Sequence, residues 1–237
     1  MLEKTRKIWA RRVQKRLFDI ARIQDLLDER ELHALEDHMG FRGQFAEHRR
    51  FQIDELKKLG LEPSSTVLEI GCGPLTAGIP VISYLDPGCY VGVDVRSSVL
   101  DVAWVQIGRN SLSAKNPQLI RSDDFGSEEL TQRQFNFVWC FSVLFHLSDD
   151  LLDRLFAVVS DRVADGGMFV ANIQTDVDSS AWLQFPFLKR TLEDYRTVAA
   201  SHGFETINLG TIEGRGFKLE GAERTNLLLK FARAKAR

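Results

Sequence analysis

Hydrophobic positions follow two alternating patterns along most of the chain. Short runs rich in Val, Ile, Leu and Phe predict buried strands over residues 66–70, 90–95, 117–121, 135–142, 168–173, 204–209 and 225–233. Between these runs, apolar residues recur every three or four positions. That spacing predicts helices over 44–59, 75–85 and 191–202, and further helices after Ser97 or Ser98 and after Ser148. Strands alternating with helices predict an α/β fold with a parallel sheet flanked by helices.

The first part of the chain has a different pattern. Apolar residues mark one face of a long helix: Trp9, Val13, Leu17, Ile20, Ile23 and Leu27. Residues 1–24 contain eight Lys or Arg and two Asp or Glu, so they carry a local charge of +6, whereas the whole chain carries −2. We therefore expect a helical extension over residues 1–60 and a separate domain over 61–237.

Three interpretations of the basic N-terminal helix remain open. The first is a helix packed on its own domain. The second is a lid or homodimerisation helix over a substrate pocket, and the third is an interfacial helix. The last would be a peripheral membrane contact with anionic lipid, since a basic face opposite Trp and Leu is typical of such helices.

The most informative stretch is residues 66–78, which read T-V-L-E-I-G-C-G-P-L-T-A-G. A buried strand is followed by a turn at Gly71 and Gly73, which have no Cβ to keep a ligand away from the backbone. The N-terminus of the following helix offers free N–H groups and the positive end of its dipole. About twenty residues on, Asp94 ends the second strand, where an acid can accept both hydroxyls of a ribose. The spacing predicts a nucleotide-sized site at the carboxyl edge of the sheet.

Composition narrows the class of protein. The 237 residues are 44% apolar and 27% charged, which is typical of a globular domain, and the net charge of −2 gives no general attraction to nucleic acid or anionic lipid. Three cysteines without metal-ligand spacing predict no metal site and a reducing, cytoplasmic setting. No apolar run approaches the length of a transmembrane helix.

Five ordered motifs together resemble one known family. They are E-I-G-C-G-P, G-V-D-V, S-D-D-F, F-N-F-V-W-C-F-S-V-L-F-H-L and A-D-G-G-M-F-V-A-N-I. In this order, over about Leu61 to Leu209, they resemble class I S-adenosylmethionine-dependent methyltransferases. The resemblance implies a Rossmann-like, seven-stranded, mostly parallel sheet flanked by helices, with S-adenosylmethionine as cofactor and S-adenosylhomocysteine as product.

The resemblance also implies a set of cofactor-binding residues at the strand ends. They are Glu69, Gly71, Cys72, Gly73, Asp94, Val95, Asp123, Asp124, Phe125 and Phe141. Asp123 aligns best with the acid that binds the adenine amino group, with Asp124 as its rival, and Phe125 either packs on the ring or belongs to the core. Asn136 stands where family members commonly have Asp, and its amide oxygen can replace a carboxylate oxygen that accepts from a backbone N–H.

His146 is the candidate catalytic residue, because a histidine of near-neutral pKa can deprotonate an attacking hydroxyl or amine. The alternative for His146 is a structural, loop-bracing role. Gln44, His48 and Arg49 are either substrate contacts or the solvent-facing side of the 44–59 helix. The aromatic cluster at Trp182–Phe187, in an irregular segment, either walls an apolar substrate pocket or plugs a loop.

The sequence favours methyl transfer to a small-molecule acceptor, with a hydroxyl oxygen of a sugar-like or natural-product substrate as the first expectation. N- or carboxyl-methylation, or a non-catalytic S-adenosylmethionine-binding partner subunit, are the alternatives. A dinucleotide oxidoreductase is disfavoured because Thr76 stands where its fingerprint needs a third glycine. Nucleic acid is an unlikely substrate because no N/D-P-P-Y-type motif follows the fourth strand and the basic residues cluster only at the N-terminus.

Overall fold

The computed structural model of the protein describes residues 44–125, 130, 133–175, 181–182, 185–218 and 225–234. The predicted basic helix and most of the predicted extension over 1–60 lie outside the described residues. The packed, lid or dimer, and interfacial interpretations of that helix therefore stay predictions.

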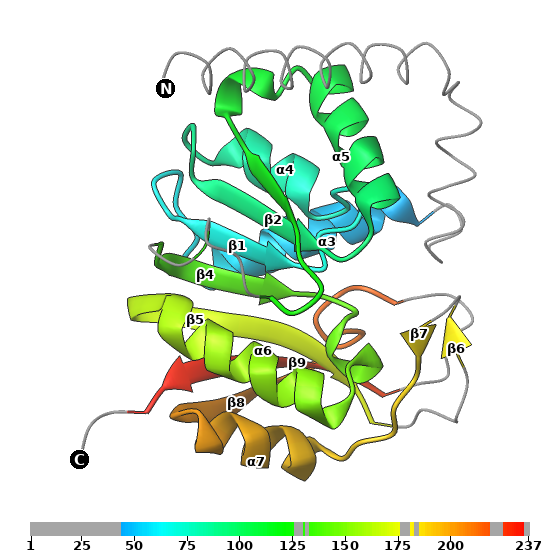
Figure 1. The fold of residues 1–237 in the computed structure, drawn as a ribbon, viewed down its shortest axis with the longest axis vertical. Helices are drawn as coiled ribbons and strands as arrows, with labels where there is room; N and C mark the ends of the chain where they lie inside the picture. The colour runs from blue at the N-terminus through cyan, green and yellow to red at the C-terminus, as the bar shows by residue number, and fades with distance from the viewer. Residues whose placement is uncertain are drawn as a thin grey trace, which may run out of the picture.

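A seven-stranded sheet forms the centre of the molecule, in the order β3-β2-β1-β4-β5-β9-β8 (Figure 1). Its strands are β1 (Val67–Ile70), β2 (Tyr90–Asp94), β3 (Gln118–Arg121), β4 (Phe135–Cys140), β5 (Val163–Gln174), β8 (Phe204–Thr211) and β9 (Asn226–Arg233). The first five strands in this order, β3, β2, β1, β4 and β5, are parallel to one another. Strand β9 runs antiparallel to both β5 and β8. The prediction of a Rossmann-like, mostly parallel seven-stranded sheet is confirmed.

Helices cover both faces of the sheet. They are α3 (Phe45–Lys58), α4 (Gly78–Tyr84), α5 (Ser97–Arg109), α6 (Asp149–Arg162) and α7 (Leu192–Ser201), with 3-10 turns η1 (Ser113–Lys115) and η2 (Leu144–His146). One apolar cluster joins α6 and α7 to one face of the sheet, and a second cluster joins α3, α4 and α5 to the other face. Figure 1 shows α6 in front of β5 and β9, with α7 below β8 at the lower end of the molecule.

Successive side chains along each strand point to opposite faces of the sheet, so they belong to different clusters. In β1, Leu68 and Ile70 belong to the cluster under α6 and α7, whereas Val67 faces the cluster under α3, α4 and α5. All four β1 residues are buried, as expected for a strand inside a parallel sheet. The core therefore holds the ends of the central strands rigidly at one edge.

Three local predictions differ from the structure. The helix predicted over 75–85 begins at Gly78, so Pro80 lies in its first turn, where the missing N–H has no helical partner to lose. The fifth strand begins at Val163 rather than at residue 168. The segment around the aromatic cluster, predicted to be irregular, contains a two-stranded antiparallel hairpin of β6 (Ala181–Trp182) and β7 (Phe185–Pro186).

The order of the strands reverses at β1. Ile70 at the end of β1 is in register with Val93 of β2 on one side and with Cys140 of β4 on the other. The chain leaves β1 toward β2, and the order then reverses on the other side of β1 through β4. In open α/β sheets ligands bind at such a reversal point. Among the described residues, no helix is long and apolar enough to cross a lipid bilayer.

Helix α3 is fastened to the connection between β8 and β9 by a buried ion pair. Arg215 donates to Leu209 O at 2.7 Å and pairs with Glu55, which is 0% exposed and also accepts from Lys58 at 2.8 Å. Phe217 stacks on Phe51 of the helix, with ring centroids 5.4 Å apart. These contacts fix α3 beside the carboxyl edge.

We predict that Arg215→Ala destabilises the fold by about 3 kcal/mol, because a buried carboxylate loses its main partner. Denaturant unfolding of the wild-type and variant proteins measures this change. The matched control is the double variant Glu55→Met with Arg215→Met, which removes both charges and should be much closer to wild type. An Arg215→Ala protein as stable as wild type would show that the pair contributes nothing.

Candidate functional site

The loop after β1 is built around two glycines with left-handed backbone, Gly71 at φ 71° and Gly73 at φ 54°. The N–H groups of Gly71 and Cys72 both donate to Val93 O, at 2.8 and 3.0 Å. A Cβ on Gly71 would lie 2.3 Å from Cγ2 of Val143, in the loop after β4. Glycine is therefore required here by the close approach of the two loops as well as by the backbone angle.

Cys72 contributes only its backbone to the edge. Its side chain is buried and packs against Gly92, where an added Cβ would lie 2.9 Å from the sulfur. Burial raises the pKa of the Cys72 thiol, so the thiol stays protonated. The predicted cofactor contact of Cys72 is thus restricted to its main-chain atoms and stays a prediction.

Asp94, at the end of β2, ties the glycine loop to the second strand. Its Oδ2 accepts from Gly73 N at 3.0 Å, and its Oδ1 accepts from Arg96 N at 2.9 Å and from Arg96 Nε at 3.1 Å. The residue is 5% exposed. The next residue, Val95, is 39% exposed, an unusual state for a large apolar side chain in this structure. A carboxylate beside an open apolar surface matches the chemistry of a ribose joined to a base.

The Glu69 side chain lies inside the sheet, against Tyr90 of β2. Its carboxyl group is 5% exposed and accepts from the Tyr90 hydroxyl at 2.5 Å, within the sheet rather than at its edge. Burial, helped by the negative charge of Asp94 and opposed by the Tyr90 bond, raises the pKa of Glu69 to about 8. Glu69 is therefore mainly protonated at neutral pH, and its contact with a cofactor stays a prediction.

The candidate adenine-binding residues after β3, Asp123 to Phe125, differ in exposure. Asp123 is exposed, whereas Asp124 accepts from the Ser122 hydroxyl at 3.1 Å and lies 3.8 Å from Arg154 of α6. Phe125 is 9% exposed and belongs to the apolar core under α6. The structure thus places Phe125 in the core, and its contact with a cofactor stays a prediction.

Phe141 and Ser142 follow the end of β4, beside the glycine loop. The Phe141 ring is half-buried and packs near His48, with ring centroids 5.1 Å apart. Ser142 has a left-handed φ of 59°, and its N–H donates to Asn172 Oδ1 at 2.5 Å. A non-glycine residue in this conformation is strained, so the buried Asn172 holds the strand end in a shape that it would not adopt alone.

His48 corrects one prediction about α3. It is 2% exposed, so the interpretation that it belongs to a solvent-facing side of the helix is wrong. Its ring contacts Gln52 at 3.3 Å, and Gln52 Oε1 in turn accepts from Trp139 Nε1 at 2.8 Å. Burial, with a smaller contribution from the charge of Arg49, lowers the pKa of His48 to about 3, which makes it a neutral core residue.

Asn136 lies at the opposite edge of the sheet. Its Oδ1 accepts from Thr66 N at 2.8 Å and from the Thr66 hydroxyl at 3.0 Å. The amide oxygen thus accepts from a backbone N–H, as the sequence suggested, and the exchange of Asp for Asn leaves this link intact.

His146 lies in η2, among aromatic rings of the β6–β7 region. Its Nδ1 is 2.8 Å from Pro186 O, and its ring centroid is 4.7 Å from Phe187 and 6.0 Å from Phe185. Because a carbonyl can only accept, Nδ1 carries the proton and the lone pair of the neutral ring is on Nε2. Burial lowers the pKa of His146, with a smaller contribution from Arg96, so the ring is neutral at physiological pH.

Sequence reasoning missed three polar residues at this edge. Arg96 joins Asp94 to the β6–β7 hairpin, since its guanidinium carbon is 5.4 Å from the Phe185 ring centroid. Asn172 and Gln174 end β5, where the letters A-N-I-Q alternate apolar and polar residues. The Gln174 Oε1 atom is buried and has no hydrogen-bond partner in the part of the chain that the structure describes. The available signal for Asn172 and Gln174 was a polar residue at every second position near the end of a strand that is otherwise apolar.

The described residues contain no group of three or more His, Cys, Asp or Glu side chains that could hold a metal ion. The polar residues of the edge are instead single acceptors and donors spaced along the ends of β1 to β5. That spacing suits an extended organic ligand better than a compact ion.

Residues 68–169 match the protein-family model of a methyltransferase domain. No curated protein matches the sequence significantly. Magnesium protoporphyrin IX methyltransferase from Synechocystis PCC 6803, solved with bound S-adenosylmethionine, is similar in structure with a TM-score of 0.63 and 14% identity. That match covers 91% of this chain and 97% of the other.

Two further solved structures show the same fold. An S-adenosylmethionine-dependent methyltransferase from Clostridium acetobutylicum has a TM-score of 0.59 at 14% identity, covering 78% of this chain and 91% of its own. A glycopeptide N-methyltransferase has a TM-score of 0.61 at 14% identity, covering 78% and 90%. At these identities the structures establish a shared fold and leave the acceptor undefined.

The raised pKa of Glu69 predicts a pH-dependent stability. Between its usual pKa of 4.5 and about 8, the unfolded chain ionises while the folded protein keeps the proton. Stability must therefore fall as pH rises through this range, by about 1.4 kcal/mol per pH unit. Glu69→Gln removes the titrating group. In denaturant unfolding, the free energy of unfolding of the variant relative to that of wild type should therefore increase steadily from about pH 5 to about pH 8.

Tyr90→Phe is the matched control, because it removes the hydrogen-bond donor and keeps the carboxyl group. Its stability should fall with pH as that of wild type does. Parallel pH profiles for Glu69→Gln and wild type would contradict a protonated Glu69.

Proposed function

We propose that this chain is an S-adenosylmethionine-dependent methyltransferase that methylates a small molecule, with a hydroxyl oxygen as the acceptor atom. The match of residues 68–169 to a methyltransferase family model and the fold shared with solved methyltransferases support this proposal. The observation that carries the proposal is the link between Gly73 N–H and the Asp94 carboxylate, beside the exposed Val95, at the reversal point of the sheet.

The residues of the edge fit S-adenosylmethionine, the product of which is S-adenosylhomocysteine. Asp94 is the acceptor for the ribose hydroxyls, and the exposed Val95 side chain gives the adenine ring an apolar surface. Asp123 is preferred over Asp124 as acceptor for the adenine amino group, because Asp124 already accepts from Ser122 and faces Arg154. Gly71 to Gly73 present backbone to the remainder of the cofactor.

When bound, the cofactor supplies a methyl carbon made electrophilic by a positively charged sulfur. The protein's main contribution is then to align the acceptor oxygen with that carbon, and orientation alone can lower a barrier by roughly 7–11 kcal/mol. His146 accepts the hydroxyl proton on Nε2, which the bond from Nδ1 to Pro186 O leaves as the basic nitrogen. Phe185 and Phe187 beside it provide an apolar wall for the acceptor.

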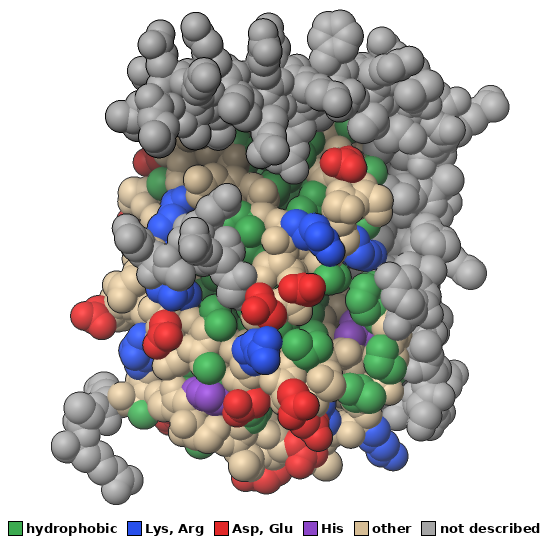
Figure 2. All heavy atoms as spheres, in the orientation of Figure 1, with side chains coloured by type: hydrophobic (Ala, Val, Ile, Leu, Met, Phe, Trp, Pro, Cys, Tyr) green, Lys and Arg blue, Asp and Glu red, His purple; other side chains and the backbone are tan. Residues whose placement is uncertain are grey.

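The surface over α6 and α7 supports a small acceptor rather than nucleic acid. Figure 2 shows acidic side chains gathered on this face, and five of them are exposed: Asp149, Asp150, Asp153, Glu193 and Asp194. A phosphate backbone would be repelled there. The cytoplasmic setting expected from the free cysteines agrees with a supply of S-adenosylmethionine.

The experiment that tests the proposal is a calorimetric titration with S-adenosylmethionine, S-adenosylhomocysteine and NAD, followed by a screen of acceptors for methyl transfer. Binding of both adenosyl ligands and none of NAD, with turnover of a hydroxyl acceptor, supports it. Binding without turnover of any acceptor favours the non-catalytic subunit. Binding of neither adenosyl ligand refutes it.

Asp94→Ala should weaken the binding of S-adenosylhomocysteine at least tenfold. Two hydrogen bonds to a charged acceptor are lost, and each such bond contributes about 1.5–3 kcal/mol. Calorimetry measures the change in affinity. Circular dichroism checks that the domain is still folded in the variant, which has lost the hydrogen bond between Asp94 and the glycine loop. Asp123→Ala and Asp124→Ala, compared in the same way, separate the two candidate adenine contacts. An unchanged affinity for Asp94→Ala would remove the ribose assignment.

His146→Gln should lower turnover by about 10²–10⁴ and leave the affinity for S-adenosylhomocysteine unchanged, because the variant lacks a base but keeps a polar side chain. The pH profile adds a readout that a structural role would not move. Because the pKa of His146 is lowered, wild-type activity should rise with pH to a midpoint below the usual 6.5 and then level off. Full activity of His146→Gln would assign it the loop-bracing role.

A further inference from the structure

The Asp94 carboxylate is already saturated with hydrogen-bond donors. A carboxylate offers about four lone-pair positions. Four donors fill them: Gly73 N–H at 3.0 Å and Arg96 Nη2 at 3.3 Å on Oδ2, and Arg96 N–H at 2.9 Å and Arg96 Nε at 3.1 Å on Oδ1. A ribose diol that binds to Asp94 needs two of these positions.

The four donors are not equally replaceable. Gly73 N–H belongs to the tight loop after β1, and Arg96 N–H belongs to the backbone that enters α5, so both are held by the fold. The other two belong to the Arg96 guanidinium, whose side chain is 18% exposed at the surface of the edge. Of these donors, only the guanidinium can move away from Asp94 without a change in the backbone conformation of the site.

We propose that Arg96 is a positioning residue that occupies the ribose acceptor of Asp94 in the cofactor-free protein and is displaced by the ribose diol. This inference rests on the proposed function, because it takes the diol of the adenosyl cofactor as the displacing group. Arg96 thus lowers the affinity for the cofactor and keeps the buried Asp94 charge paired until the cofactor arrives.

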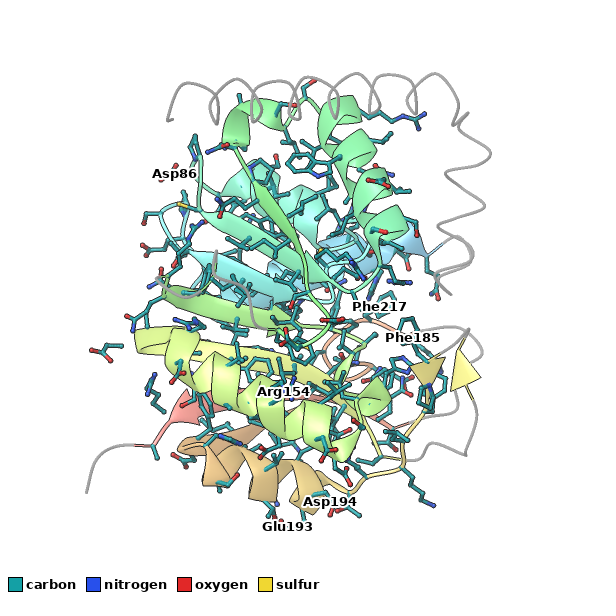
Figure 3. All side chains as sticks on the ribbon, viewed as in Figure 1. Asp86, Arg154, Phe185, Glu193, Asp194 and Phe217 are labelled. Atoms are coloured by element: carbon teal, nitrogen blue, oxygen red, sulfur yellow. The ribbon has the colours of Figure 1, made fainter. Side chains whose placement is uncertain are left out.

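While it is paired with Asp94, the Arg96 guanidinium also connects the two halves of the site. It lies against Phe185 of β7, with 5.4 Å between the guanidinium carbon and the ring centroid. The Phe185 ring is 6.0 Å from the His146 ring, and the carbonyl of the next residue, Pro186, accepts a hydrogen bond from His146 Nδ1–H. Figure 3 shows Phe185 at the side of the molecule where the parallel strands end. Movement of Arg96 therefore acts on the hairpin that orients the candidate base.

The test is a calorimetric titration of Arg96→Gln with S-adenosylhomocysteine. Glutamine keeps much of the side-chain stem but offers no charged fork to Asp94. Since partly exposed ion pairs contribute little, the affinity should rise about threefold to tenfold over wild type. Arg121→Gln is the matched control: it removes a guanidinium at the same edge that donates to Val95 O at 3.2 Å and should leave the affinity unchanged.

A pair of nucleosides identifies the displacing group. Adenosine should gain affinity for Arg96→Gln as S-adenosylhomocysteine does, whereas 2′,3′-dideoxyadenosine, which cannot compete for Asp94, should not. An equal gain for both nucleosides, or weaker or unchanged binding of S-adenosylhomocysteine to Arg96→Gln, overturns the inference. Failure of wild-type protein to bind S-adenosylhomocysteine at all is a separate result, which refutes the proposed function instead.

The link to the hairpin is tested by Phe185→Leu. Without the ring, the guanidinium is held less firmly over Asp94, so this variant should also bind S-adenosylhomocysteine more tightly, by less than Arg96→Gln does. In the double variant the two gains should not add, because both act through the same guanidinium. Independent, additive effects would show that Phe185 has no part in holding Arg96.

Discussion

The hydrogen bond from Gly73 N–H to Asp94 is the constraint on which the site depends. It joins the loop after β1 to the end of β2, so the two elements that would hold the two ends of a nucleoside cannot move apart. The loop reaches this position only because Gly71 and Cys72 both donate to Val93 O and because Gly71 has no Cβ to meet Val143. The geometry of the whole edge thus follows from a few backbone contacts between β1, β2 and β4.

The fold could be predicted from the sequence because its signals are local and repeated. Buried strands and amphipathic helices alternate, and glycine marks the turn where α3 ends, at Gly60 with φ 98°. The prediction failed where tertiary contacts outweigh local pattern. Leu75 continues the helical spacing, yet it adopts a φ of 64° and is fully buried, and α4 begins only after it. No propensity argument predicts a leucine in that conformation.

The candidate site could be predicted only in part, for a similar reason. Motif order places Asp94 and His146 at the edge, since strand ends follow from strand assignments. It does not say where a side chain points within a strand. Glu69 and Cys72 both lie in the most informative stretch of the sequence, yet the structure turns both side chains into the core. Arg96 and Phe185 are 89 positions apart in the chain, and their contact is a tertiary one that no local pattern predicts.

Two hydrogen bonds fix the shape of the edge around His146. Asn172 holds the strained Ser142, and Pro186 O fixes the tautomer of His146, so both residues have defined positions in the folded protein. The buried Gln174 Oε1 has no hydrogen-bond partner among the described residues, which is destabilising by about 1–3 kcal/mol, and such groups are rare in folded proteins. The ends of β4 and β5 thus both contain unfavourable local arrangements, at Ser142 and Gln174, that the surrounding core maintains.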